Sequence, residues 1–342
     1  MRVDRTITTL GGVLAALLFT AVGAAPAVAQ QDALREAVAV YDAAQYDRAI
    51  ELLHEVNTGA GSDPATRREA LRYLARACTA KRAYDDARRA LDALLSLEPP
   101  LVELDPEIEN PHLVRLYYEA RRDRQGYDVE RPDPGMKTLA IMDFSNSSLH
   151  ERATYEPLEE GFASMMGHYL GGATDLKVVE RERVQWLLDE LQLQRDTTVV
   201  DEATAVRTGK VLGVHVVLFG SYTVHENTMR IGARLVKVET SEVILSEHLF
   251  GKPDDFFELI ERLSLQVAQA VNVTLERSDV QGRRATRSLD AMLAYSEGLV
   301  LLERDRFDEA HARFEQAAEY DPDYTQARQR AESLRPLLAS SR

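Results

Sequence analysis

One carboxylate stands where α/β proteins often place ligand contacts. Asp143 lies at the end of the apolar run KTLAIMDF, one residue before Phe144. This run predicts a short strand, and the carboxyl ends of such strands commonly face bound ligands. The run continues into SNSS at residues 145–148, whose short polar side chains can organise a loop through hydrogen bonds to the backbone. The sequence favours this loop-organising role for Asp143 and leaves a small ligand beside it as the alternative.

Metal binding and catalysis require side chains that converge, and the sequence shows no such pattern. None of the eight histidines forms an H-x-H or H-x-x-x-H pair, and His215 and His225 are too far apart along one predicted strand to share an ion. The sequence contains neither a phosphate-binding glycine loop nor a nucleophile elbow. We therefore expect no catalytic residue, no metal ligand and no cofactor, and a protein that is not an enzyme.

The single cysteine and the charge balance narrow the choice of partners. Cys78 has no second cysteine to pair with, and its place on the inward side of a helical pattern predicts a small buried hydrophobe. The formal net charge of −15 disfavours nucleic acid or anionic lipid as a partner, because both require clustered Lys and Arg. Arg283, Arg284 and Arg287 form one basic cluster, which lies in a predicted linker.

The first 29 residues are typical of a signal peptide. Arg2 and Arg5 precede the apolar stretch at residues 11–22, and Ala27-Val28-Ala29 offers a cleavage site. A membrane anchor is the alternative, but the apolar stretch is shorter than the ~20 residues that a spanning helix needs. Because Gln30 and not Cys follows the cleavage site, we expect an exported protein without a lipid anchor and without an integral membrane span after cleavage.

Residues 32–123 and 285–338 both show helical periodicity with small residues at fixed places. The stretches QYDRAIELLHEV and RAYDDARRALDALLSLEP each place an aromatic residue three positions before an alanine, where two helices must approach closely. Pro111 occupies a first-turn position that favours the start of a further helix. The C-terminal stretch repeats the scheme with Gly298, Ala310, Phe314, Ala317 and Pro322.

This last spacing resembles the tetratricopeptide (TPR) repeat, which has a period of about 34 residues. In that family the small residues let paired helices touch, and the proline ends the second helix. The same register on residues 68–101 gives Ala75, Ala87, Leu91, Leu94 and Pro99, with Ala75 in place of the glycine and Leu94 in place of the second alanine. A third copy on residues 30–63 gives Ala37 and Ala49 and has Gly61 where the proline is expected.

Residues 136–275 have a different pattern, in which short strands alternate with amphipathic helices. The strand KTLAIMDF, a helix over residues 158–170, the strand LKVVE, a helix around residues 184–191 and a shorter one at 202–211 precede three strands at residues 220–245. A closing helix starts at Pro253. Strands with helices between and after them predict a layered α/β domain.

These landmarks resemble the curli assembly and transport (CsgG-like) family over about 140 residues of the chain. The segments LAIMDFSN, LKVVERERVQWLLDE and LGVHVVLFGSYT carry the resemblance, with the pair Glu180-Arg181 before a helix and Gly220 at a strand bend as its most telling residues. Glu180-Arg181 is interpreted as a helix start, and a subunit contact is the alternative. Periplasmic domains of Tol-type envelope proteins share this layout, so the resemblance implies a periplasmic location and leaves peripheral association with the outer membrane open.

Pore-forming members of the CsgG-like family insert two additional hairpins, for which this sequence has no room. The corresponding joins are His225–Met229 and Leu249–Pro253, whereas a membrane-spanning strand needs about 9–11 residues. We therefore expect a water-soluble sheet that turns one apolar face, Met229, Ile231, Ala233 and Leu235, toward the predicted helices.

The sequence thus predicts a multidomain protein in which all-α helical repeats (32–123 and 285–338) flank a central α/β domain (136–275). Repeat helices offer concave surfaces for peptides or partner helices, which is a binding function without chemistry. The predicted function is a non-enzymatic periplasmic scaffold that binds other envelope proteins. The alternative is a structural or accessory subunit of an outer-membrane secretion or assembly apparatus, with self-association through the central domain.

Overall fold

The computed structural model describes residues 24–59, 63–97, 104–131, 133, 135–192 and 201–339. The predicted signal peptide falls largely on residues 1–23, outside the described residues, and Pro99 of the second repeat register also lies outside them. Among the helices of the described ranges, none has both the length and the apolar character needed to cross a membrane.

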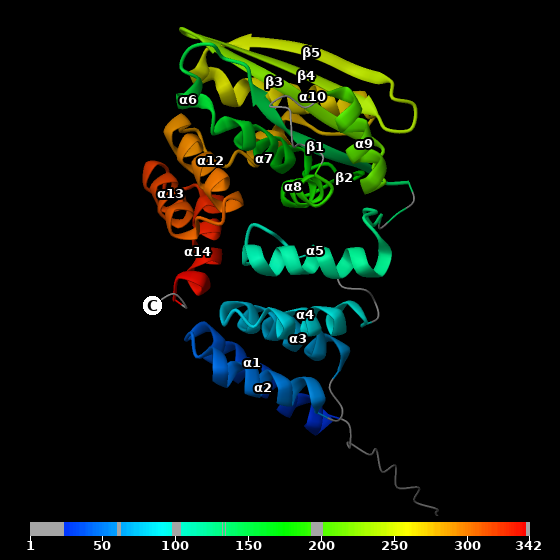
Figure 1. Ribbon diagram of the computed structural model, residues 1–342, viewed down its shortest axis with the longest axis vertical. Helices are drawn as coiled ribbons and strands as arrows, with labels where there is room; N and C mark the ends of the chain where they lie inside the picture. The colour runs from blue at the N-terminus through cyan, green and yellow to red at the C-terminus, as the bar shows by residue number, and fades with distance from the viewer. Residues whose placement is uncertain are drawn as a thin grey trace, which may run out of the picture.

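The N-terminal part consists of helices packed side by side. They are α1 (Ala24–Asp42), α2 (Tyr46–Thr58), α3 (Pro64–Ala80), α4 (Tyr84–Leu95) and α5 (Pro111–Gln125). The side chains of Asp63 and Asn110 accept hydrogen bonds from backbone N–H groups in the first turns of α3 and α5, each of which has proline as its first residue. Helices α1–α4 form one end of the molecule, and α5 lies between them and the sheet (Figure 1).

The central part is a five-stranded mixed sheet with helices on both faces. Its strands are β1 (Lys137–Asn146), β2 (Leu176–Val178), β3 (Val216–His225), β4 (Thr228–Lys237) and β5 (Val243–Gly251), in the order β2-β1-β3-β4-β5. Strand β1 pairs in parallel with β2 and β3, and β3, β4 and β5 form the predicted antiparallel meander. The expectation of helical parts combined with a mixed α/β part is confirmed at this level.

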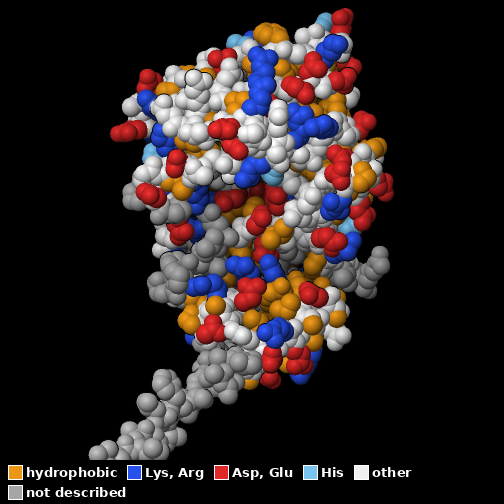
Figure 2. All heavy atoms as spheres, turned by 180° about the vertical axis from the view of Figure 1, so that it is seen from behind, with side chains coloured by type: hydrophobic (Ala, Val, Ile, Leu, Met, Phe, Trp, Pro, Cys, Tyr) orange, Lys and Arg blue, Asp and Glu red, His pale blue; other side chains and the backbone are white. Residues whose placement is uncertain are grey.

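Several helical segments of different length accompany the sheet in the described part of the chain. They are α6 (Arg152–Tyr155), α7 (Leu158–Leu170), α8 (Arg181–Glu190), α9 (Glu202–Leu212), the 3₁₀ helix η1 (Pro253–Asp255), α10 (Phe256–Ala270) and α11 (Arg277–Gly282). Helices α7 and α10 pack in one core with one face of the sheet, and α8 and α9 pack on the other face. Seen from behind, the surface is hollowed between the part that contains the sheet and the N-terminal helices (Figure 2).

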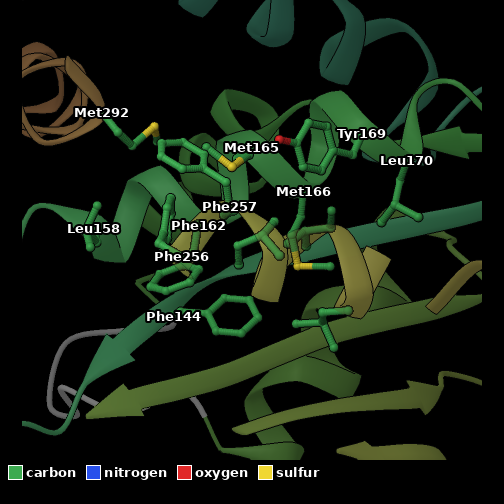
Figure 3. Packing of buried hydrophobic residues seen from close by; sticks show 14 of the residues in the cluster. Phe144, Leu158, Phe162, Met165, Met166, Tyr169, Leu170, Phe256, Phe257 and Met292 are labelled. Carbon is green, nitrogen blue, oxygen red and sulfur yellow. The ribbon is translucent and has the colours of Figure 1, made fainter. Parts of the chain in front are cut away.

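Aromatic and sulfur side chains fill the core between the sheet, α7 and α10. The Phe162 ring lies 4.7–5.5 Å, centroid to centroid, from the rings of Phe144, Tyr222 and Phe256. Met165, Met166 and Tyr169 of α7 extend the same layer (Figure 3). The predicted apolar face of β4 is buried against this layer, as expected: Met229, Ile231, Ala233 and Leu235.

The C-terminal part comprises α12 (Leu289–Glu303), α13 (Phe307–Tyr320) and α14 (Thr325–Ala339). Helix α12 packs against α7, where a Cβ atom at Gly161 would collide with the Ser296 side chain. The apolar core of the sheet therefore continues without a break into these helices, from Leu139 in β1 to Leu337 in α14.

The turns of three helix pairs share one geometry that the sequence does not reveal, and the same geometry also occurs at Gly213 after α9 and at Asn272 after α10. Ala44, Arg82 and Asp305 have φ of 57°, 59° and 55°, in the left-handed region that favours glycine. The residue after each donates its backbone N–H to the carbonyl five positions earlier: Gln45 to Val40, Ala83 to Cys78 and Arg306 to Leu301. Each of these three left-handed residues lies seven positions after the first small residue of its repeat, which is Ala37, Ala75 or Gly298.

Candidate functional site at the junction of three segments

Two of the predicted landmark residues, Asp143 and Arg181, meet in a buried ion pair. Arg181 opens α8 and donates from Nε and Nη2 to the two carboxylate oxygens of Asp143, at 2.7 and 2.8 Å. Its Nη2 also donates to Glu303 Oε1 of α12 at 2.5 Å. Gln185 Nε2 donates to Asp143 Oδ2 at 2.7 Å. Arg181 thus joins the sheet, α8 and the C-terminal helices through charge-assisted hydrogen bonds.

The loop-organising role predicted for Asp143 was wrong. Strand β1 continues to Asn146, and the Asp143 carboxylate accepts hydrogen bonds from two side chains of α8. Asn146 and Ser148 organise the loop instead: Asn146 Oδ1 accepts from the Ser148 N–H, and Ser148 Oγ accepts from the Val224 N–H. The Arg181 helix start is observed, but its side chain carries the larger structural role.

A second buried arginine ties the C-terminal helices to the N-terminal part. Arg330 of α14 is 3% exposed, donates to the Pro106 carbonyl at 2.7 Å and forms an ion pair with Glu182 of α8. At the outer edge, Arg115 of α5 pairs with Asp305 at 3.2 Å. The three segments of the chain therefore meet around α8.

Carboxylates crowd this junction, and burial shifts their protonation. Burial raises the pKa of Glu160 to about 8, against the opposing attraction of Arg181. Burial likewise raises the pKa of Glu303, again opposed by Arg181. Burial also opposes ionisation of Glu182, but Arg330 and Arg181 outweigh it and lower the pKa of its carboxyl. Glu160 Oε2 is buried without a hydrogen-bond partner among the described residues, as expected for a carboxyl that is not fully compensated.

A cleft of about 470 Å³ opens beside this network, between α5, α8 and α12. Its apolar walls include Val114, Tyr118, Trp186 and Leu302, and the Tyr118 and Trp186 rings lie 5.7 Å apart. A neighbouring cavity of about 400 Å³ shares four lining residues with it, Pro106, Arg181, Glu182 and Arg330. Trp186 is half-buried and lines the cleft.

The remaining predicted residues lie in packing contacts outside the cleft. Gly220 faces Phe144, whose ring carbon Cε1 would lie 2.5 Å from an added Cβ, and Glu180 precedes α8 as its N-cap residue without a side-chain cap. A Cβ atom added at Gly298 would likewise lie 2.5 Å from ring carbon Cε1 of Phe314. Pro322 follows the end of α13. Several other repeat residues are fully buried within their helix pairs: Ala75, Ala87, Ala310 and Ala317.

Sequence reasoning missed the residues that complete the junction, which are Glu182, Glu303 and Arg330. Their partners are distant in the chain: the residue numbers differ by 122 for Arg181 and Glu303 and by 148 for Glu182 and Arg330. Within the described residues, His, Cys, Asp and Glu side chains form no group of three or more that could hold a metal ion. The site therefore offers ion pairing, hydrogen bonding and apolar contact.

Comparison with known proteins assigns no family to this chain. No protein-family model matches it, and no curated protein matches it by sequence. Among solved structures, TolB from Acinetobacter baumannii is similar over 42% of this chain and 30% of its own, with 10% identity and a TM-score of 0.26. The LpoB C-terminal domain from Salmonella enterica is 17% identical with a TM-score of 0.26, and the matched region covers 40% of this chain and 94% of that domain. The Escherichia coli LpoB domain is 18% identical with a TM-score of 0.25, over 36% of this chain and 87% of that domain. Similarity this low assigns neither a fold family nor a function.

Proposed function

We propose that this protein is a non-enzymatic scaffold of the bacterial cell envelope. In this proposal the mature chain is periplasmic, TPR helices flank a CsgG-like domain that lacks the pore-forming hairpins, and its surfaces bind other envelope proteins. The observation that carries the proposal is the junction around α8, where Arg181 and Arg330 hold the helical parts against the sheet through buried ion pairs. Such a junction fixes several binding surfaces in one orientation, which is what a scaffold requires.

The recurring turn supports the TPR assignment of the helical parts. Helix pairs α1/α2, α3/α4 and α12/α13 each turn through a left-handed residue at the same place in the register. In the last pair, Gly298 contacts Phe314, as close approach of the two helices requires. Agreement between the register of small residues and the turn geometry makes a common repeat unit the simplest explanation.

The short joins of the sheet support a CsgG-like domain without pore-forming hairpins. Strands β3 and β4 are connected by Glu226 and Asn227 alone, and only Lys252 separates the end of β5 from η1. The strand that a pore-forming hairpin would extend, β4, is instead fully engaged by β3 and β5. The proposal therefore excludes channel formation.

Capture of native partners tests the scaffold proposal. Full-length protein carrying a C-terminal tag is expressed in its host, crosslinked in intact cells and purified, and bound proteins are identified by mass spectrometry. Specific recovery of envelope proteins, with a mature N-terminus at Gln30, is expected. Exclusive recovery of cytoplasmic proteins, or an unprocessed N-terminus at Met1, would contradict the proposal. The native mass separates the alternative: a monomer or dimer fits the scaffold, whereas a large ring fits a subunit of a secretion or assembly apparatus.

A further inference from the structure

The cleft between α5, α8 and α12 contains more negative charge than its own arginines neutralise. Six carboxylates and three guanidinium groups line it. Each guanidinium is already engaged: Arg115 with Asp305, Arg181 with Glu303 and Arg330 with Glu182. A further carboxylate, Glu190, is paired with Arg122.

Two carboxylates remain on different walls of the cleft. Glu119 belongs to α5 and Asp189 to α8, and neither has an ion-pair partner among the described residues. Asp189 is exposed at the rim, and yet partial desolvation raises the pKa of its carboxyl against the weaker attraction of Arg115. A cation placed between these two walls would supply the missing charge.

One residue that lines the cleft also carries a buried polar group without a partner among the described residues. The Tyr118 hydroxyl has no hydrogen-bond partner among the described residues, although the side chain is only 5% exposed. A phenolic hydroxyl both donates and accepts hydrogen bonds, so leaving it buried without a partner is unfavourable. The neighbouring Trp186 ring and Leu302 give the cleft an apolar wall suited to the methylene stem of a long side chain.

We infer that this cleft binds an extended segment of a partner protein through an Arg or Lys side chain, with Glu119 and Asp189 as its ion-pair partners. The inference rests on the proposed scaffold function and names the chemistry of the partner. Arginine fits best, since its planar guanidinium can pair with a carboxylate through two hydrogen bonds and stack on an aromatic ring such as that of Trp186. The adjoining cavity at Pro106 and Arg330 provides room for the residues that flank this side chain.

Trp186 provides a direct measurement because it is the only tryptophan of the chain and lines the cleft. Its fluorescence is titrated with the peptide acetyl-Gly-Arg-Ala-Arg-Gly-amide, with the Gln-for-Arg version of that peptide, and with N-acetylargininamide. We expect the Arg peptide to bind saturably and the Gln peptide to bind at least tenfold more weakly. The affinity for the Arg peptide should fall as the salt concentration increases. Binding of the Arg and Gln peptides with equal affinity would overturn the inference. Equal affinity for N-acetylargininamide would also overturn it, because the site would then be one for a small guanidinium compound.

Charge-neutral variants locate the site. We expect Glu119→Gln with Asp189→Asn to weaken binding of the Arg peptide about tenfold and each single variant to weaken it about threefold. The matched control, Glu55→Gln with Glu319→Gln, removes the same charge from exposed positions outside the cleft and leaves binding unchanged. An equal loss of affinity for the Arg peptide in both double variants would mean that the peptide is attracted to the whole acidic protein, and it would overturn the assignment of the site to this cleft. If native envelope partners are captured but no peptide changes the Trp186 fluorescence, the cleft inference fails and the scaffold proposal stands. If no envelope protein is captured, the scaffold proposal itself fails.

Discussion

The helix pairs at the two ends of the chain follow one register but bury their apolar faces in different ways. At the N-terminus, α1 to α5 form a core of their own, from Ala37 to Ala120. At the C-terminus, the pair α12/α13 shares the core of the sheet, and α12 packs directly on α7. The difference shows that the register fixes how two helices of a pair touch, whereas the neighbours of the pair decide which core it joins.

The reason is the number of adjacent helices. The pair α3/α4 has the pair α1/α2 on one side and α5 on the other, so most of its apolar surface is covered by helices of the same segment. Among the described residues, the pair α12/α13 packs on α14 through α13, and the central domain covers the other face of α12 through α7. One helical pair cannot bury its own apolar face, and about three repeats are normally needed for independent stability.

The largest expected effect comes from separating the two ends from the sheet. A fragment of residues 285–342 should show weak helix by circular dichroism and melt without a cooperative transition, because its core partners Met165 and Leu158 in α7 are missing. A fragment of residues 30–125 contains the whole N-terminal core and should melt cooperatively. A sharp transition in the C-terminal fragment would refute this account of the difference.

Matched substitutions at equivalent positions sharpen the comparison. Phe314 and Leu91 occupy the same place in the register and are both fully buried. We expect Phe314→Ala to lower the free energy of unfolding of the core that contains the sheet by about 3–5 kcal/mol, and Leu91→Ala to lower that of the N-terminal core by about 2–5 kcal/mol. Urea unfolding followed by circular dichroism measures both. Identical effects of the two variants on a single transition would mean that the cores unfold as one unit.

The ion pairs at α8 should carry a smaller share of the stability. Arg181→Leu removes the ion-pair partner of the largely buried Asp143 carboxylate and of the partly exposed Glu303 carboxylate, so we expect the free energy of unfolding in urea to fall by about 3 kcal/mol. Adding Asp143→Asn should recover part of that loss, since it removes one of the two uncompensated charges. In the control Arg335→Leu, an exposed pair with Glu332 is lost, and the cost should stay below about 1 kcal/mol. Equal costs of Arg181→Leu and Arg335→Leu would show that the junction is not stabilising.

The pH dependence of stability tests the crowding of carboxylates beside Arg181. Burial raises the pKa of Glu160 to about 8, and the facing groups are Arg181, Asp143 and Glu303. The folded protein therefore holds the proton of the Glu160 carboxyl more tightly than the unfolded chain does, because the pKa of a glutamate in the unfolded chain is about 4.3. The contribution of Glu160 is fully present below that lower pKa and is lost as the pH rises through about 8.

Glu160→Gln should thus match the wild type near pH 4 and melt at least about 2–4 °C higher than the wild type near pH 9. Calorimetry at the two pH values measures the difference, and Glu319→Gln on the exposed face of α13 serves as the control. A wild type that is more stable than Glu160→Gln at the higher pH would show that the carboxylate is compensated there.

The parts of the fold that depend on local pattern could be predicted from the sequence. Alternation placed Met229 and Leu235 on the covered face of the sheet, and the register of small residues placed Gly298 where it contacts Phe314. The candidate site could not be predicted in the same way. The partners Arg181 and Glu303 belong to different segments, and their meeting depends on how α12 docks on α7, which no periodicity encodes.

The turns between paired helices were missed for a related reason. Arg82 and Asp305 adopt left-handed backbone conformations although neither is glycine, so residue type gives no signal there. The close packing of the two helices and the bond from the next N–H to the carbonyl five positions earlier hold the backbone in this conformation. Such local strain persists only where the surrounding structure determines it.

The smallest expected effect concerns the rate at which a maleimide labels Cys78, which should not change in Phe314→Ala. This measurement tests most directly whether the two cores open independently. Cys78 is buried in the N-terminal core, and burial raises the pKa of its thiol to about 11. Native protein should therefore react with a maleimide only when that core opens, and the rate measures the opening. If the cores open separately, Leu91→Ala accelerates labelling by at least about tenfold, whereas Phe314→Ala leaves the rate within about twofold of wild type, because the core that it weakens does not contain Cys78. Comparable acceleration by both variants would show that the junction around α8 couples the two cores into a single cooperative unit, and the contrast between the two ends would then be one of packing and not of stability.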